Sequence, residues 1–186
     1  MKRFAILTLA LVLGVASALT AGYFVHPKPQ TVQAEVQWAE VYRTPDGLVA
    51  GADLIVVARH VTAQPGRVVG TIPFTYNGFE IERLIKGRHA GNDLVVEQTG
   101  GQLPDGAMLS IEDGGAFRPG QSYLLFLKAQ ARNGVYYQIN HQARYEIGSD
   151  GLLRGIDPTD RVVAAFNGQQ AHGAIEQVER RVRLIQ

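Results

Sequence analysis

The spacing of hydrophobic and polar residues divides the chain into three stretches. An uncharged, mostly apolar run from Phe4 to Val25 follows Lys2 and Arg3 at the N-terminus. Residues 48–157 contain short apolar runs separated by glycine-containing turns, a pattern typical of β-strands. Residues 158–186 end in a stretch where apolar positions recur every three or four residues, which indicates a helix. The pattern therefore predicts a leader, a β-rich domain and a C-terminal helical segment.

The β-rich stretch contains several distinct strand predictions. Tyr123–Leu127 is apolar on both faces, so we expect it to be a central strand covered on both sides. Asn133-Gly134 is the strongest hairpin signal and joins that strand to the next one. The expected strands are Leu54–Val61, Thr71–Tyr76, Phe79–Lys86, Asp93–Gln98, Ala107–Ile111, Tyr123–Leu127, Val135–Ile139, and short strands at Tyr145–Ile147 and Leu152–Leu153.

Turn signals divide these strands. Asn77-Gly78 marks a bulge or a tight turn, and Gly100-Gly101 closes the strand before it. In the linker and entry segment, residues 26–47, Thr31–Arg43 reads as a weak strand or a short helix, and Pro45-Asp46-Gly47 predicts a turn.

The C-terminal helix has one apolar stripe. We expect this stripe to pack on the β-domain rather than on a membrane surface, because two glutamates dilute the basic charge. Glu176 should face Arg180, and Glu179 should face Arg183, at the favourable i,i+4 spacing. The stripe comprises Ala171, Ala174, Ile175, Val178, Val182 and Ile185.

Residues 1–25 predict export by one of two routes. A signal peptide would be cleaved near Ala16-Ser17-Ala18 or Leu19-Thr20-Ala21. Alternatively, the apolar run is long enough to remain as a membrane anchor. On either reading the rest of the chain is secreted or membrane-anchored and extracytoplasmic, and it touches a membrane only through an uncleaved leader.

Composition narrows the possible chemistry. The 186 residues suffice for one folded domain, and the absence of cysteine excludes a disulfide scaffold and a thiol nucleophile. Of the 18 basic residues two precede the leader's apolar run, so the exported part nearly balances its 17 acidic residues. Without a concentrated basic field, we expect no nucleic-acid partner.

The order of the motifs suggests a family. Ala52–Val61 is followed by Phe79–Gly87, then by Gly100-Gly101, and finally by Pro119–Leu127. This order resembles a loose group of uncharacterised exported bacterial proteins. Their domain is similar to the OB-type barrel of tissue inhibitors of metalloproteinases (TIMP) and netrin-like (NTR) modules.

This resemblance covers about residues 50–155. It implies a mainly β (α+β) fold, a small OB-like β-barrel followed by the amphipathic helix. It transfers no site residue, because those inhibitors bind the protease zinc through an N-terminal cysteine that this chain lacks.

Metal ligands and nucleophiles are sparse. The histidines match no ligand spacing, although His60 and His141 could approach each other in a closed barrel. The serines beyond the leader occupy no nucleophile elbow. We therefore predict no metal, no cofactor and no catalytic residue. The residues considered are His26, His60, His89, His141 and His172, and Ser110, Ser122 and Ser149.

Two further groups could carry function. Glu80 and Glu82 share one strand face at a separation that glycoside hydrolysis could use, although a solvated face is favoured. Aromatic residues in excess of one core could form a binding face. These aromatic residues are Trp38, Tyr42, Tyr76, Tyr136 and Tyr137.

The first functional hypothesis is a non-catalytic extracytoplasmic binding or interaction module, with a protein or glycan as its partner. The alternatives are an envelope hydrolase that uses the surface carboxylates and a protease inhibitor by architectural analogy.

Overall fold

The structure is a computed structural model that describes residues 31–33, 40–110, 115–130 and 134–185. These residues belong to one compact unit, Thr31–Gln186. The leader, His26 and Trp38 lie outside the described residues. In the part of the chain that is described, no helix is both long enough and apolar enough to span a bilayer.

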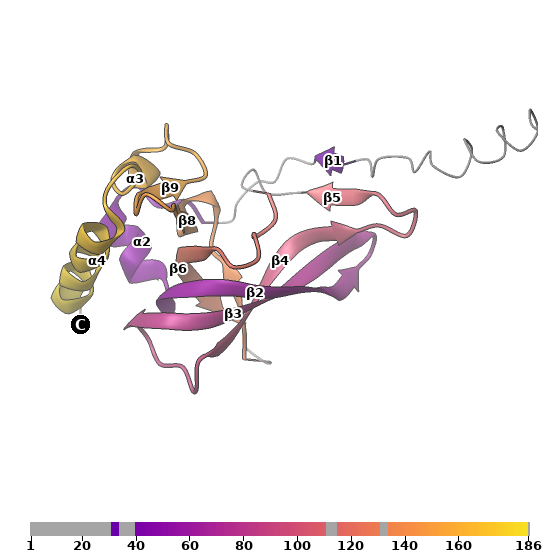
Figure 1. The fold of residues 1–186 in the computed structure, drawn as a ribbon, viewed down its shortest axis with the longest axis horizontal. Helices are drawn as coiled ribbons and strands as arrows, with labels where there is room; N and C mark the ends of the chain where they lie inside the picture. Colours follow the sequence, from indigo (N-terminus) through magenta and orange to yellow (C-terminus); the bar gives the residue numbers. More distant parts are fainter. Residues whose placement is uncertain (1–30, 34–39, 111–114, 131–133, 186) are drawn as a thin grey trace, which may run out of the picture. The chain divides into compact units, whose positions relative to one another are not determined.

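The fold is mainly β, with a helix at its C-terminal end, as the sequence predicts. Figure 1 shows α2, α3 and α4 gathered at one end of the strands, and β5 beside β4 away from those helices. In chain order the elements are β1 (Thr31–Gln33), α2 (Pro45–Gly51), β2 (Leu54–Val69), β3 (Ile72–Lys86), β4 (Asp93–Gln102), β5 (Met108–Ser110), β6 (Ser122–Ala129), β7 (Val135–Gln138), a 3-10 turn (His141–Ala143), β8 (Arg144–Ile147), β9 (Leu153–Gly155), α3 (Arg161–Ala164) and α4 (Ala171–Ile185).

Five strands close into a ring. β2 pairs with β3, and β3 pairs with β4, both antiparallel. β4 pairs in parallel with β7, whose other edge pairs with β6, and β6 returns to β2. Outside the ring, β8 and β9 extend from β6, while β5 and β1 extend from the end of β4.

Two apolar cores share the strands β2 and β6. One core fills the ring, and the other lies between these strands and the helices. Leu125 and Leu127 of β6 face the ring, whereas Leu124 and Phe126 face the helices. Successive side chains of a strand point to opposite faces, so β6 is buried on both sides. The prediction for Tyr123–Leu127 is confirmed.

Two turn predictions are wrong, and a third is confirmed only as a bulge. Pro45-Asp46-Gly47 begins α2 instead of turning the chain. Thr44 caps this helix by accepting the N–H of Gly47 at 3.1 Å, and proline suits the first helical turn, where its missing N–H costs nothing. The side-chain Nζ of Lys86 then binds the carbonyl oxygens of Val49, Ala50 and Ala52 at 2.7–3.0 Å, which holds the helix C-terminus.

The other two signals lie within long strands: Asn77-Gly78 lies at a bulge, one of its two predicted alternatives, whereas Gly100-Gly101 does not close its strand. β3 runs through Asn77-Gly78, and a register shift between His60 and Thr62 of β2 absorbs the irregularity as a bulge. A Cβ at position 78 would lie 2.6 Å from Thr62 Oγ1, so glycine permits this close approach. β4 continues through Gly100-Gly101 to Gln102 and pairs there with β5.

The C-terminal helix packs on the β-domain as predicted, except that Ile185 at the end of the stripe is exposed. Ala174, Ile175, Val178 and Val182 of α4 are buried in the core on the helical side. Glu176 and Arg180 approach to 3.9 Å, as expected. Glu179 instead binds Arg83 of β3 at 2.6 Å, because packing of the stripe on the sheet brings a cation from another element within reach.

Candidate functional site

The ring interior is apolar through most of its length and becomes polar at one end. Along β2 the interior side chains are Leu54, Val56 and Ala58, followed by His60. The alternation of β3 and β4 places Asn77 and Gln98 at the same end. Three neighbouring strands therefore each contribute one polar side chain to this end of the ring.

These three side chains form a hydrogen-bonded row. His60 Nε2 lies 3.2 Å from Asn77 Oδ1, an atom that can only accept, so the imidazole proton sits on Nε2. Asn77 Nδ2 donates to Gln98 Oε1 at 3.4 Å, and Gln98 Nε2 donates to the carbonyl of Gly115 at 2.9 Å. The row fixes the positions of both amide groups.

Aromatic packing holds the imidazole in place. The ring of His60 lies 5.1 Å from that of Phe79 and 5.9 Å from that of Phe117, measured between centroids. The side chain is fully buried, and among the described residues Nδ1 has no hydrogen-bond partner. A fully buried imidazole that bonds Asn77 in an apolar enclosure suits the role of a fixed structural group.

A pocket of about 480 Å³ opens beside this row, which we name the mouth pocket. Its volume lies within the range of about 300–1,000 Å³ that is usual for small-ligand sites. β2, β3, β4 and β5 contribute to it. The lining residues are Ala63, Thr75, Asn77, Gln98, Thr99, Gly100, Gly101, Met108, Leu109, Ser110, Gly115 and Ala116.

The described lining of the mouth pocket carries no charged side chain. Its polar groups are amides and hydroxyls, which donate and accept hydrogen bonds without ionising near neutral pH. Three glycines, Gly100, Gly101 and Gly115, also line the pocket, and Gly101 has a φ of 146°, a conformation that suits glycine. The pocket can therefore hold an uncharged polar ligand or an extended backbone.

The predicted histidine candidates are dispersed. His89 lies 2.8 Å from the carbonyl of Asp93, His141 lies 3.4 Å from Asp160, and His172 lies 3.2 Å from Glu176. His60 faces the ring, whereas His141 lies beside α3. No group of three or more metal-binding side chains occurs in the described residues.

The carboxylate pair lies on an exposed face, as favoured from the sequence. Glu80 and Glu82 are 49% and 40% exposed, and both contact Arg59 of the neighbouring strand. Glu82 also accepts a hydrogen bond from Ser122 at 3.0 Å. Ser149 is exposed, and Ser110 lines the mouth pocket.

The aromatic candidates do not gather on one face. Tyr137 is 41% exposed, but Tyr136 packs against the ring core and contacts His89. Tyr42 packs against the helical core, where burial first and then the Glu40 carboxylate raise its pKa to about 12. No described residue of the aromatic group lines the mouth pocket.

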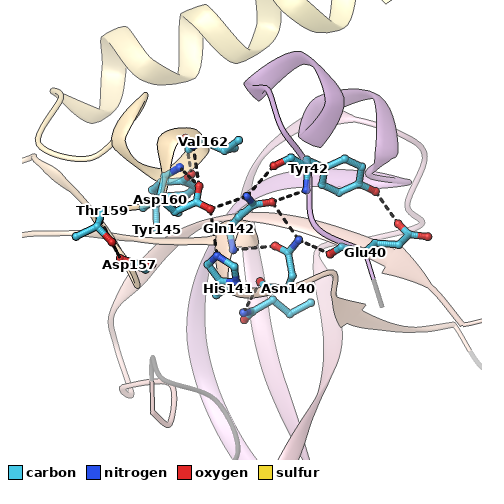
Figure 2. Close-up of polar contacts among 12 residues, drawn as sticks. Glu40, Tyr42, Asn140, His141, Gln142, Tyr145, Asp157, Thr159, Asp160 and Val162 are labelled. Carbon is cyan, nitrogen blue, oxygen red and sulfur yellow. Dashed lines mark hydrogen bonds and ion pairs between the residues drawn. The ribbon is translucent and has the colours of Figure 1, made fainter. Parts of the chain in front are cut away.

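A second polar cluster has a structural role (Figure 2). At its centre lies Gln142, which bonds the backbone N–H and carbonyl of Tyr42, each at 2.9 Å, and the carboxylate of Asp160 at 3.0 Å. Asn140 donates to the carbonyl of Glu40 at 2.6 Å. This cluster ties residues 40–42 to the start of α3.

Sequence reasoning missed the mouth pocket. The signal was available as polar residues at positions 60, 77 and 98 within otherwise apolar strand faces. Locating the pocket from that signal would have required the strand register, since Asn77-Gly78 predicts either a bulge or a tight turn and leaves the register open. No protein-family model matches the chain, and no curated protein matches its sequence.

Proposed function

We propose that this chain is a non-catalytic, extracytoplasmic binding module whose ligand occupies the mouth pocket. The observation that carries the proposal is the hydrogen-bonded row His60–Asn77–Gln98, which holds two amide groups at the edge of a concave site. Fixed polar groups in a largely uncharged pocket favour specific binding, because little entropy is lost when the ligand engages them. The extracytoplasmic location is inferred from the N-terminal leader.

The proposed architecture is an OB-type barrel of the TIMP and netrin-like kind. The five strands close in the order β2-β3-β4-β7-β6, with one parallel pair, β4 with β7. OB-type barrels bind ligands on the face of their second and third strands. Here those strands are β3 and β4, and both line the mouth pocket, which supports the assignment.

The pocket chemistry selects the class of ligand. Amide and hydroxyl groups such as those of Asn77, Gln98 and Ser110 complement peptide bonds or sugar hydroxyls and give no preference to ions. We therefore propose a protein segment or a glycan of the cell envelope as the partner.

Hydrolysis by Glu80 and Glu82 is a weaker proposal. General acid catalysis needs a carboxyl group that stays protonated near neutral pH, which usually requires burial or a nearby like charge. Both carboxylates are instead half-exposed and contact a guanidinium. Protease inhibition is proposed only by analogy with the TIMP and netrin-like family that the sequence resembles.

Affinity capture tests the binding proposal. Both cores lie between Leu48 and Val182, so residues 27–186 retain them whole. This fragment would be immobilised and exposed to envelope and secreted extracts, and retained molecules identified by mass spectrometry.

Two matched variants make the capture specific. Ala63→Trp fills the mouth pocket from β2, whereas Gln64→Trp places the same side chain on the opposite face of that strand. We expect a partner that is retained by wild type and Gln64→Trp and lost by Ala63→Trp. Equal retention by all three proteins would refute the pocket as the site.

A further inference from the structure

The outer edge of β5 carries a short segment of the chain itself. Thr31–Gln33 forms β1 and pairs in parallel with β5, matching Thr31 to Met108, Val32 to Leu109 and Gln33 to Ser110. β5 is also three residues long, and its other edge pairs with Gly100–Gln102 of β4. β1 is therefore the outermost strand of this part of the sheet.

Pairing of this length is weak. A parallel ladder is somewhat less stable per residue than an antiparallel one, and three residues provide only a few hydrogen bonds. Ordering each residue has an entropic cost that such bonds barely offset. β1 therefore leaves the edge more easily than a strand of the ring does.

The same edge borders the mouth pocket. Met108, Leu109 and Ser110 are the residues that pair with β1, and all three line that pocket. Alternate side chains of a strand added to β5 point to the pocket's side of the sheet. Backbone pairing and side-chain recognition are thus available to one ligand at once.

We propose that the β5 edge is a docking site for an extended peptide, and that Thr31–Gln33 occupies it as a displaceable intrachain competitor. This inference rests on the proposed function of the mouth pocket and names its ligand as a peptide strand rather than a glycan. Strand addition to an open sheet edge uses main-chain hydrogen bonds for affinity and neighbouring pockets for specificity.

The perturbation removes β1 without altering the pocket. Consecutive N–H groups of a strand point to opposite sides, so Val32→Pro/Gln33→Pro deletes one N–H that faces β5 in either orientation. Val32→Thr/Gln33→Thr is the matched control, because threonine keeps both N–H groups and favours strands. Both double variants would be made in residues 27–186.

The probe is a synthetic peptide with the sequence of residues 29–37, capped at both ends and titrated while the backbone amides of Met108–Ser110 are followed by NMR. A tethered segment competes at an effective concentration of about 1 mM. If β1 occupies the edge about half of the time, the proline variant should bind the peptide about twofold more tightly than the threonine control. Before peptide is added, the backbone amides of β5 should exchange with solvent faster in the proline variant than in the threonine control. Saturating peptide should slow this exchange.

Two results would overturn the inference: the same affinity in both variants, or amide shifts that leave Met108–Ser110 unaffected. The capture experiment separates this failure from failure of the mouth pocket. If Ala63→Trp abolishes capture while both double variants capture normally and bind no peptide, the pocket proposal stands and the edge proposal falls.

Discussion

Replacing Asp160 by alanine should lower the stability of the fold by removing two distinct interactions. Asp160 Oδ1 caps α3 by accepting the N–H groups of Val162 at 2.7 Å and Val163 at 3.1 Å. Asp160 Oδ2 accepts from Nε2 of Gln142 at 3.0 Å and lies 3.4 Å from His141 (Figure 2). One carboxylate therefore supports both the helix start and the polar cluster around Gln142.

The expected loss follows from these two roles. An N-cap substitution by alanine costs about 0.5–2 kcal/mol. Gln142 is fully buried and would keep only its bond to Tyr42 from Nε2, and an unpaired buried donor costs about 1–3 kcal/mol. We therefore expect Asp160→Ala to lower the free energy of unfolding by about 2–4 kcal/mol, measured by urea denaturation followed by circular dichroism.

Asp157→Ala is the matched control. Among the described residues, the Asp157 carboxylate accepts hydrogen bonds only from the N–H and hydroxyl of Thr159, at 2.9 and 2.7 Å, in an exposed loop. We expect Asp157→Ala to lower stability less than Asp160→Ala does, because water replaces exposed hydrogen bonds. A loss at Asp160 no larger than the loss at Asp157 would refute the role assigned to the buried cluster.

The pH dependence provides a second test of the same carboxylate. Burial alone would raise the pKa of Asp160, but hydrogen bonds from Val163, Gln142, Val162 and His141 outweigh burial and hold the pKa below its usual value. Because the folded-state pKa is the lower one, the ionised group stabilises the fold above the unfolded pKa of about 3.9. That stabilisation disappears as the pH falls through the folded-state pKa, so the stability gap between wild type and Asp160→Asn should narrow below about pH 4.

Four further variants test the packing, the ion pairs and the surface carboxylates. Gly155→Ala should destabilise by about 1–3 kcal/mol in urea denaturation, because a Cβ there would lie 2.2 Å from Val163 Cγ1 in a filled core; an unchanged midpoint would contradict the packing. Arg67→Ala should lower stability more than Arg83→Ala does, because it leaves the 5% exposed Glu97 with Gln130 but without its guanidinium partner. Arg83→Ala, which breaks an exposed ion pair, should cost at most about 1 kcal/mol. Glu80→Gln/Glu82→Gln should leave capture intact, and any hydrolytic activity of the wild type that this double variant abolished would favour the hydrolase.

Strands are predicted well from the sequence where the spacing of the apolar residues matches the burial of the strand. Leu54–Val61 and Tyr123–Leu127 are dense in apolar residues, and both lie in strands buried on two sides. Gly134, at the end of the predicted Asn133-Gly134 turn, has a φ of 64° and lies between β6 and β7, which pair as expected. These features depend on local residues and on burial alone, which is why they can be predicted.

Predictions fail where distant residues decide the structure. Pro45-Asp46-Gly47 reads locally as a turn, but burial of Leu48 and the cap supplied by Lys86 favour a helix. Asn77-Gly78 leaves a bulge and a tight turn open, and β2 and β4 supply the partners on both sides that keep the strand extended. The mouth pocket was missed for the same reason, because its polar row forms only when three strands are in register.

The most direct test of the mouth pocket is an NMR spectrum of isotopically labelled residues 27–186 in unlabelled envelope extract. We expect the side-chain amide resonances of Asn77 and Gln98 to shift or broaden together, while that of Gln177 on α4 stays unchanged. The same extract should leave Asn77 and Gln98 unaffected in Ala63→Trp. Changes centred on another surface, such as the exposed Tyr137, with Asn77 and Gln98 unmoved, would contradict the proposed site.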